Sequence, residues 1–212
     1  MLISGRGSNM AALIRAAEAP DYPAEIALVI SNRKDAPGLA FAAGRGIETA
    51  VIAHKGFVDR ASFDLAMTVR METARIDIVC LAGFMRLLSP SFCATWEGRL
   101  INVHPALLPA FKGLDTHARA LRGGVKIHGA TVHFVIPEMD GGPIIAQAAV
   151  PVLDTDTEEV LGARVLAQEH RIYPLALNLV ASGAVSIGQG RTWCGSTANA
   201  ARALLSPAPT ED

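Results

Sequence analysis

The chain has 212 residues, of which 50% are apolar and 18% are charged, so it can build one globular domain and is too apolar to be disordered throughout. Its 19 basic residues balance 20 acidic ones for a net charge of −1, which excludes a broad basic surface for nucleic acid. The sequence has no apolar run of the roughly 18 residues that a membrane-spanning helix needs, and its first residues lack the pattern of a signal peptide.

Short β-rich runs alternate with helical patterns in the N-terminal half, which predicts a parallel sheet with helices on both faces. The expected strands are residues 2–4, 25–30, 49–52, 76–82 and 99–103. The expected helices are residues 9–19, 38–43 and 59–74, followed by one that starts at Ser89 and Pro90, a typical cap and first-turn pair. Phe63, Met67 and Met71 recur at a spacing of four and predict the buried face of the third helix.

The C-terminal half predicts an antiparallel hairpin, with strands at residues 131–136 and 144–152 around a turn at 140–143. A long loop at 105–115 precedes it, and a long helix follows Thr155 and Thr157. The predicted fold is an α/β protein: an open, mostly parallel twisted sheet with a Rossmann-like N-terminal half and the hairpin in its C-terminal half. Residues 1–195 are expected to form a single domain, and 196–212 a flexible tail.

The three cysteines are odd in number and widely spaced, so they predict neither a disulfide framework nor a metal-binding pair. Cys80 lies inside the apolar run 76–82 and is expected to be a small buried side chain. These features favour a cytoplasmic protein that does not contact membranes.

The turn at residues 5–9, Gly-Arg-Gly-Ser-Asn, joins the first strand to the first helix. Backbone N–H groups at such a turn, together with the positive end of the helix dipole, form an anion site. A dinucleotide fold would need a third glycine and an acidic residue after the second strand, whereas this chain has Met10 and the pair Ser31-Asn32. We therefore interpret the turn as a monophosphate site, with a tight turn that binds nothing as the alternative.

Asn102 and His104 end a predicted strand on the same side, at the edge where open α/β sheets bind ligands. An amide and an imidazole can together stabilise negative charge on one carbonyl oxygen during nucleophilic addition. Asp140, in the turn 140–143, is the candidate for the acid–base group that such a reaction needs. Taken singly, a hydrogen-bonded structural histidine and an ordinary turn aspartate are the simpler interpretations.

Six motifs along the chain favour the catalytic interpretation of these residues. Together, and in this order, they resemble the folate-dependent phosphoribosylglycinamide formyltransferases. The resemblance covers roughly residues 2–175 and rests on SGRGSN at 4–9, LAGFMR at 81–86, NVHPALLP at 102–109, GLDTH at 113–117, HGATVHF at 128–134 and DGGPI at 140–144.

The resemblance implies transfer of the formyl group of 10-formyltetrahydrofolate to the amine of phosphoribosylglycinamide in purine biosynthesis. It implies that Asn102, His104 and Asp140 are the catalytic residues and that His133 supports His104, the alternative being a buried core histidine. It further implies that the ribonucleotide is held by Gly7, Ser8, Asn9 and Glu169, and the folate by Arg60, Met85, Arg86, Leu87, Leu88, Ile136, Pro137, Glu138, Met139 and Asp140.

The expected partners are these two small molecules, with no nucleic acid, no membrane and no metal, and the chain is expected to be a monomer or a homodimer. Two alternatives remain open: a formyltetrahydrofolate hydrolase, which shares the Asn-His-Asp arrangement but transfers the formyl group to water, and a non-catalytic module that binds folate or a nucleotide. A methionyl-tRNA formyltransferase is disfavoured because 212 residues at a net charge of −1 offer neither room nor charge for a tRNA-binding domain.

Overall fold

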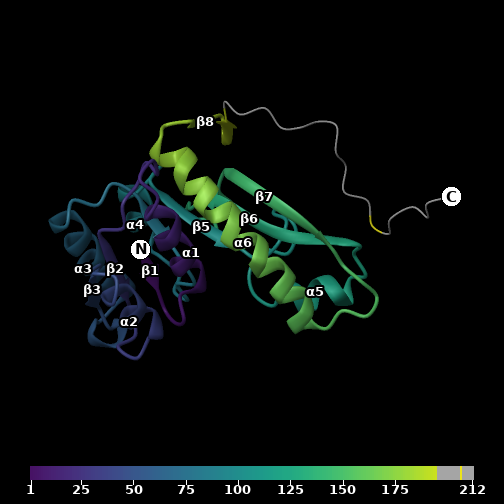
Figure 1. The fold of residues 1–212 in the computed structure, drawn as a ribbon. Coiled ribbons are helices and arrows are strands. Elements are labelled where there is room, and N and C mark those ends of the chain that lie inside the picture. Colours follow the sequence, from purple (N-terminus) through teal and green to yellow (C-terminus); the bar gives the residue numbers. More distant parts are fainter. Residues whose placement is uncertain (195–205, 207–212) are drawn as a thin grey trace.

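The computed structural model describes residues 1–194 and residue 206. A seven-stranded sheet in the order β3-β2-β1-β4-β5-β6-β7 forms the centre of the molecule, and helices cover both of its faces (Figure 1). The strands are β1 (Leu2–Ile3), β2 (Leu28–Ser31), β3 (Glu48–Val51), β4 (Val79–Leu81), β5 (Leu100–His104), β6 (Ile127–Phe134) and β7 (Ile144–Pro151). The helices are α1 (Ser8–Ala17), α2 (Pro37–Ala43), α3 (Arg60–Thr73), α4 (Pro90–Thr95), α5 (Thr116–Arg122) and α6 (Glu158–Ala181), with a 3₁₀ turn at His54–Gly56.

The strands β3, β2, β1, β4 and β5 pair in parallel, whereas β5 with β6 and β6 with β7 pair antiparallel. The predicted fold class is therefore confirmed, including the hairpin. The order reverses between β1 and β4, and the loops at the carboxyl ends of strands on either side of such a switch point form the usual ligand crevice. This crevice brings the turn after β1 next to the segment after β4.

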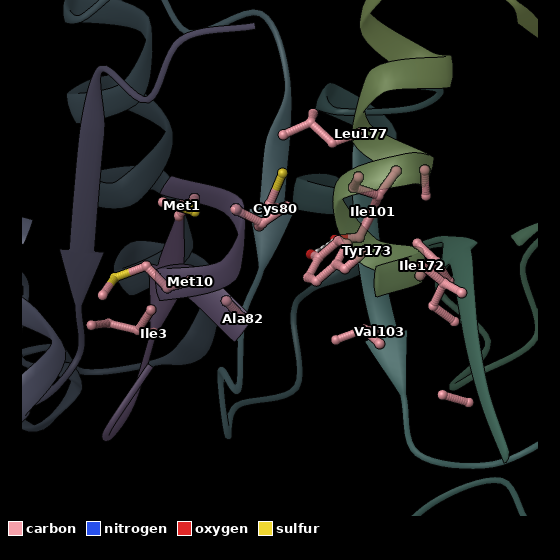
Figure 2. Close-up of a cluster of buried hydrophobic side chains, with 14 of the residues drawn as sticks. Met1, Ile3, Met10, Cys80, Ala82, Ile101, Val103, Ile172, Tyr173 and Leu177 are labelled. Atoms are coloured by element: carbon pink, nitrogen blue, oxygen red, sulfur yellow. Dashed lines mark hydrogen bonds between the residues drawn. The ribbon is translucent and has the colours of Figure 1, made fainter. Parts of the chain in front are cut away.

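Alternation along the strands divides the core between the two faces of the sheet. Ile3, Cys80 and Ile101 enter one cluster with α1 and α6, which Figure 2 shows around Tyr173, whereas Leu2 and Leu100 enter a second cluster with α3 and α4. The second cluster contains Phe63, Met67 and Met71, the residues predicted from their spacing of four. Cys80 is buried as expected, and burial raises the pKa of its thiol to about 11.

Three helices begin after a side-chain cap: α4 after Ser89, the predicted cap, α3 after Asp59, the first residue of the expected helix, and α6 after Thr157, which was expected to precede it. The Asp59 carboxylate accepts a hydrogen bond from the Ser62 amide at 2.8 Å, and the Ser89 hydroxyl accepts one from the Phe92 amide at 3.2 Å. The Thr157 hydroxyl does the same for Val160 at 3.3 Å. Each side chain satisfies an N–H group that the first helical turn cannot pair.

The structure differs from the sequence prediction at several boundaries. β2 starts three residues later than the expected strand, and β4 is limited to Val79–Leu81. Each strand extends only over the residues that pair with a neighbouring strand. Helix α5 and a separate antiparallel pair, β8 (Val185–Gly188) with β9 (Arg191–Cys194), were not predicted. The expected tail at 196–212 lies outside the described residues apart from residue 206. Within the described part of the chain, no helix combines the length and apolar character needed to cross a membrane.

Candidate active site

The turn after β1 has the backbone geometry of an anion site. Gly7 caps α1 in the left-handed region, at φ +71°, and no acidic residue lies in the first turn of the helix. A residue with a Cβ is strained at this φ, and the added atom would lie 3.0 Å from the Met10 side chain. The helix end therefore carries no acidic side chain of its own in the first turn and no bulky side chain at the cap.

A cleft of about 410 Å³ opens in front of this turn. It lies at the switch point of the sheet, between the turn after β1, the end of β2 and the segment after β4. Its lining contains three arginines, of which one, Arg33, pairs with Asp35 at 2.8 Å. The other two bring positive charge that favours an anion, although the whole chain has a net charge of −1. The charged or titratable residues of the lining are Arg6, Arg33, His54 and Arg86.

Asn9 and Glu169 form a buried pair beside this cleft. The Asn9 Nδ2 donates to Glu169 Oε2 at 2.6 Å and joins α1 to α6. Burial raises the pKa of Glu169, while the hydrogen bond from Asn9 acts in the opposite direction. The Asn9 Oδ1 is buried without a hydrogen-bond partner among the described residues, so the pair retains unused hydrogen-bonding capacity next to the turn after β1.

β5 presents Asn102 and His104 on one face of the sheet, because they alternate with Ile101 and Val103 of the first cluster. Across the antiparallel ladder, Asn102 lies opposite His133 of β6. The Asn102 Nδ2 is 3.4 Å from His133 Nε2. The sequence prediction that Asn102 and His104 share a face is therefore confirmed.

Asp140 lies in the turn between β6 and β7, in a left-handed conformation at φ +50°. Its Oδ2 is 3.4 Å from His104 Nδ1, and its Oδ1 is 3.7 Å from His133 Nε2. The Asp140 side chain is 11% exposed and the His104 side chain 6%. The amide, the imidazole and the carboxylate thus converge on one mostly buried spot at the carboxyl end of β5.

The hydrogen bonds define the role of each histidine nitrogen. His104 Nε2 donates to the Phe111 carbonyl at 2.9 Å, so its two nitrogens face a carbonyl and a carboxylate. His133 Nδ1 donates to the Phe134 carbonyl at 2.8 Å, and burial lowers the pKa of His133, so His133 is neutral and its Nε2 accepts from Asn102.

Two backbone groups of the long loop, which the sequence analysis did not predict, complete the site. Besides the Phe111 carbonyl on His104, the Gly113 amide donates to Asp140 Oδ2 at 2.8 Å. Backbone contacts leave no side-chain signal, so residue types alone could not reveal them. They show that the 105–115 loop, expected to be functional from its length, contacts two of the three candidate catalytic residues.

The residues predicted to bind folate fall in three places. Met85, Leu87 and Met139 are large apolar side chains that are exposed, whereas Phe84 and Leu88 pack against the second cluster. Met85 and Arg86 also line the cleft in front of the turn after β1. Arg60 is exposed at the first residue of α3 and lines neither of the two clefts described for residues 1–194.

Asp140 also lines a second cleft of about 410 Å³, between the β6–β7 turn, the 105–115 loop and the start of β9. The Lys112 ammonium at its edge pairs with Glu138 at 2.7 Å. Among residues 1–194 and 206, no group of three or more His, Cys, Asp or Glu side chains is arranged to hold a metal ion.

Comparison with known proteins agrees with this geometry. Residues 1–177 match the family described as formyl transferase, and the fold and site thus define a formyl-group transferase. The phosphoribosylglycinamide formyltransferase of Escherichia coli (strain K12) is 44% identical over 193 residues, covering 91% of each chain. This chain therefore belongs to the formyl transferase family, among the phosphoribosylglycinamide formyltransferases.

Longer relatives and solved structures agree. The human trifunctional purine biosynthetic protein adenosine-3 is 50% identical over 194 residues, but the chain spans only 19% of that relative's length. The structure of glycinamide ribonucleotide transformylase 1 from Symbiobacterium toebii superposes with a TM-score of 0.89 at 44% identity, covering 91% of both chains. The phosphoribosylglycinamide formyltransferase from Brucella melitensis is 55% identical with a TM-score of 0.82, over 86% of this chain and 94% of its own.

Proposed function

We propose that this protein transfers the formyl group of 10-formyltetrahydrofolate to the amine of phosphoribosylglycinamide in purine biosynthesis. The observation that carries the proposal is the convergence of Asn102, His104 and Asp140, with 3.4 Å between His104 Nδ1 and Asp140 Oδ2, beside a cationic cleft at a phosphate turn. The family membership and the relatives' names supply the reaction class.

In this reaction Asn102 and His104 Nδ1, the nitrogen that the Phe111 carbonyl does not occupy, donate to the formyl oxygen as it becomes negative when the amine attacks. Asn102 has a second Nδ2 hydrogen free for this task while the first faces His133, and removing one such donor typically lowers kcat about 10²–10³-fold. Asp140 takes the proton that the amine loses, directly or through a water, and the proton then passes to the departing folate nitrogen. His133 positions Asn102 and Asp140 from β6.

The ribonucleotide phosphate binds at Gly7, Ser8 and Asn9, because the α1 N-terminus and the cationic lining both favour an anion. Glu169, paired with Asn9 at 2.6 Å, accepts hydrogen bonds from the ribose or the glycinamide end. These assignments place the nucleotide at the switch point between β1 and β4, with its amine directed along the strand ends toward β5.

The folate binds across residues 85–88 and 136–140, with Arg60 further out as a partner for its carboxylate end. Support comes from the exposed apolar side chains of Met85, Leu87 and Met139, because large apolar side chains gathered at a surface mark a ligand-binding groove. Both segments follow strands that flank β5, so a ligand held by them reaches the catalytic residues.

The chemistry needs no metal ion, and the two substrates are the partners that this site supports. A cytoplasmic location and a monomer or homodimer remain our predictions.

Replacing Asp140 with Asn tests the role of the carboxylate. We expect kcat to fall about 10³-fold, since the loss of a general acid–base group costs about 10²–10⁴, while ribonucleotide binding by calorimetry stays within a few-fold. Asp154→Asn is the control, because Asp154 is an exposed carboxylate paired with Lys126. Full turnover by the Asp140 variant would refute the role.

The reaction itself is tested by the absorbance change on release of the deformylated folate, with and without phosphoribosylglycinamide. Product that forms only with the ribonucleotide supports the transferase. Product in its absence identifies a hydrolase, and no product under either condition identifies a binding module.

A further inference from the structure

The four residues 111–114 contact both titratable members of the catalytic trio. The Phe111 carbonyl accepts from His104 Nε2 at 2.9 Å, and the Gly113 amide donates to Asp140 Oδ2 at 2.8 Å. His104 Nδ1 and Asp140 Oδ2 are 3.4 Å apart, so this one segment binds both members of a close pair. A small displacement of the segment would change both the tautomer of His104 and the direction of Asp140.

This segment belongs to neither a helix nor a strand. Phe111 has φ +55° and Gly113 has φ +82°, and a left-handed conformation costs a non-glycine residue about 1 kcal/mol. No ladder of backbone hydrogen bonds offsets that cost within the segment. Tertiary contacts must therefore maintain its shape.

Arg119, one turn into α5, makes those contacts. Its Nη1 donates to the Lys112 carbonyl at 2.6 Å and lies 3.3 Å from the Leu114 carbonyl. Its guanidinium also lies over the Phe111 ring, 5.6 Å from the ring centre. A planar guanidinium can reach two carbonyls and an aromatic face at once, which the ammonium of lysine cannot do.

A second side chain also supports the Phe111 ring. His128 of β6 packs against it in a T-shaped arrangement, with 5.6 Å between ring centres and an interplanar angle of 83°. Burial and the neighbouring His117 lower the pKa of His128 to about 4, so this partner is an uncharged ring at neutral pH. Arg119 is thus the cation that binds the backbone of the segment, beside the ion pair of Lys112 with Glu138, and His128 packs against its ring as an uncharged partner.

We propose that Arg119 is a positioning residue for formyl transfer: it holds residues 111–114 so that the Phe111 carbonyl binds the His104 Nε2–H and the Gly113 amide binds Asp140. The inference rests on the proposed function for its consequence in turnover. Arg119 touches neither His104 nor Asp140 and acts through the backbone of the segment, so its loss alters catalysis without removing a group that contacts substrate.

The test compares Arg119→Ala, Arg119→Lys and the control Arg122→Ala, which removes an exposed arginine from the same helix. For Arg119→Ala we expect kcat to fall 10- to 100-fold, with KM for both substrates within about three-fold, and partial recovery when free guanidinium is added. Arg119→Lys should keep the fold and lose several-fold in kcat. Arg122→Ala should match the parent protein.

A second readout separates positioning from general stability and from the proposed function. The ¹⁵N spectrum of His104 should show a protonated Nε2 in the parent protein, and loss of that fixed state in Arg119→Ala. An unchanged His104 spectrum together with unchanged kcat, or a rise in kcat, in either folded Arg119 variant would overturn the inference. If the parent protein transfers no formyl group, the proposed function fails while the His104 spectrum still decides the role of Arg119.

Discussion

Gly142 shows how closely single residues determine the position of Asp140. A Cβ added at Gly142 would lie 1.8 Å from the Phe134 carbonyl oxygen and 2.8 Å from its carbon. Those atoms belong to the end of β6 and cannot move aside as a side chain can, so the turn two residues after Asp140 would have to shift.

We therefore expect Gly142→Ala to lose about 3 kcal/mol of unfolding free energy and at least 100-fold in kcat. Gly141→Ala is the matched control, because the three nearest atoms to a Cβ there belong to the side chain of Glu138, which is exposed and can rotate away once its ion pair with Lys112 opens. Urea unfolding and steady-state kinetics on both variants check this prediction. Equal behaviour of the two would show that the turn tolerates displacement.

At the scale of single residues, the sequence predicted which side chains form the candidate site but not the contacts that the backbone makes to them. Asn102 and His104 could be placed together because strand alternation fixes the face on which each lies. The approach of Asp140 to His104 depends on a left-handed φ of +50°, which its residue type permits but does not require. The Phe111 carbonyl and the Gly113 amide are common to every residue type, so no pattern could have singled them out.

At the scale of elements, Tyr173 joins α6 to the centre of the sheet. Its hydroxyl donates to the Leu81 carbonyl at 2.9 Å and lies 3.2 Å from the Ile101 carbonyl, within the cluster that Figure 2 shows. Glu169 lies four residues earlier on the same face of α6, where it contacts Asn9 of α1. The hydroxyl therefore fixes the helix that carries a proposed substrate-binding carboxylate.

Tyr173→Phe should lower the unfolding free energy by about 1 kcal/mol, because it removes one buried hydrogen bond and little volume. For a chain of this length that corresponds to a fall in Tm of about 3 °C. Thermal unfolding of the variant beside the parent protein measures it. No change in Tm would mean that the ring, rather than its hydroxyl, holds α6.

Elements with strong local signals were predicted correctly, and elements stabilised by tertiary contacts were missed. The caps at Asp59, Ser89 and Thr157 and the apolar spacing in α3 are local features, and all of them are present in the structure. Helix α5 has seven residues and begins after a left-handed Asp115 whose side chain makes no capping hydrogen bond. Asp115 is a residue type that favours N-caps, but the structure does not use its side chain as one.

For the whole molecule, buried histidines make stability depend on pH. The pKa values of His117, His128, His133 and His170 are all lowered, with burial as the largest cause in each case. They account for four of the six histidines in the chain. In the unfolded chain a histidine has a pKa of about 6.5. Below that pH the unfolded state therefore binds protons that the folded state does not.

The folded protein should accordingly lose stability as the pH falls below about 6.5, with no contribution from these groups above that value. For His128, whose pKa falls to about 4, the loss extends over the whole interval between the two values. Replacing His128 with Asn should make the dependence shallower by up to about 1.4 kcal/mol per pH unit, whatever the substitution costs at pH 8. Urea unfolding at pH 8, 6.5, 5.5 and 4.5 measures both slopes, and equal slopes would mean that His128 titrates alike in the folded and unfolded states.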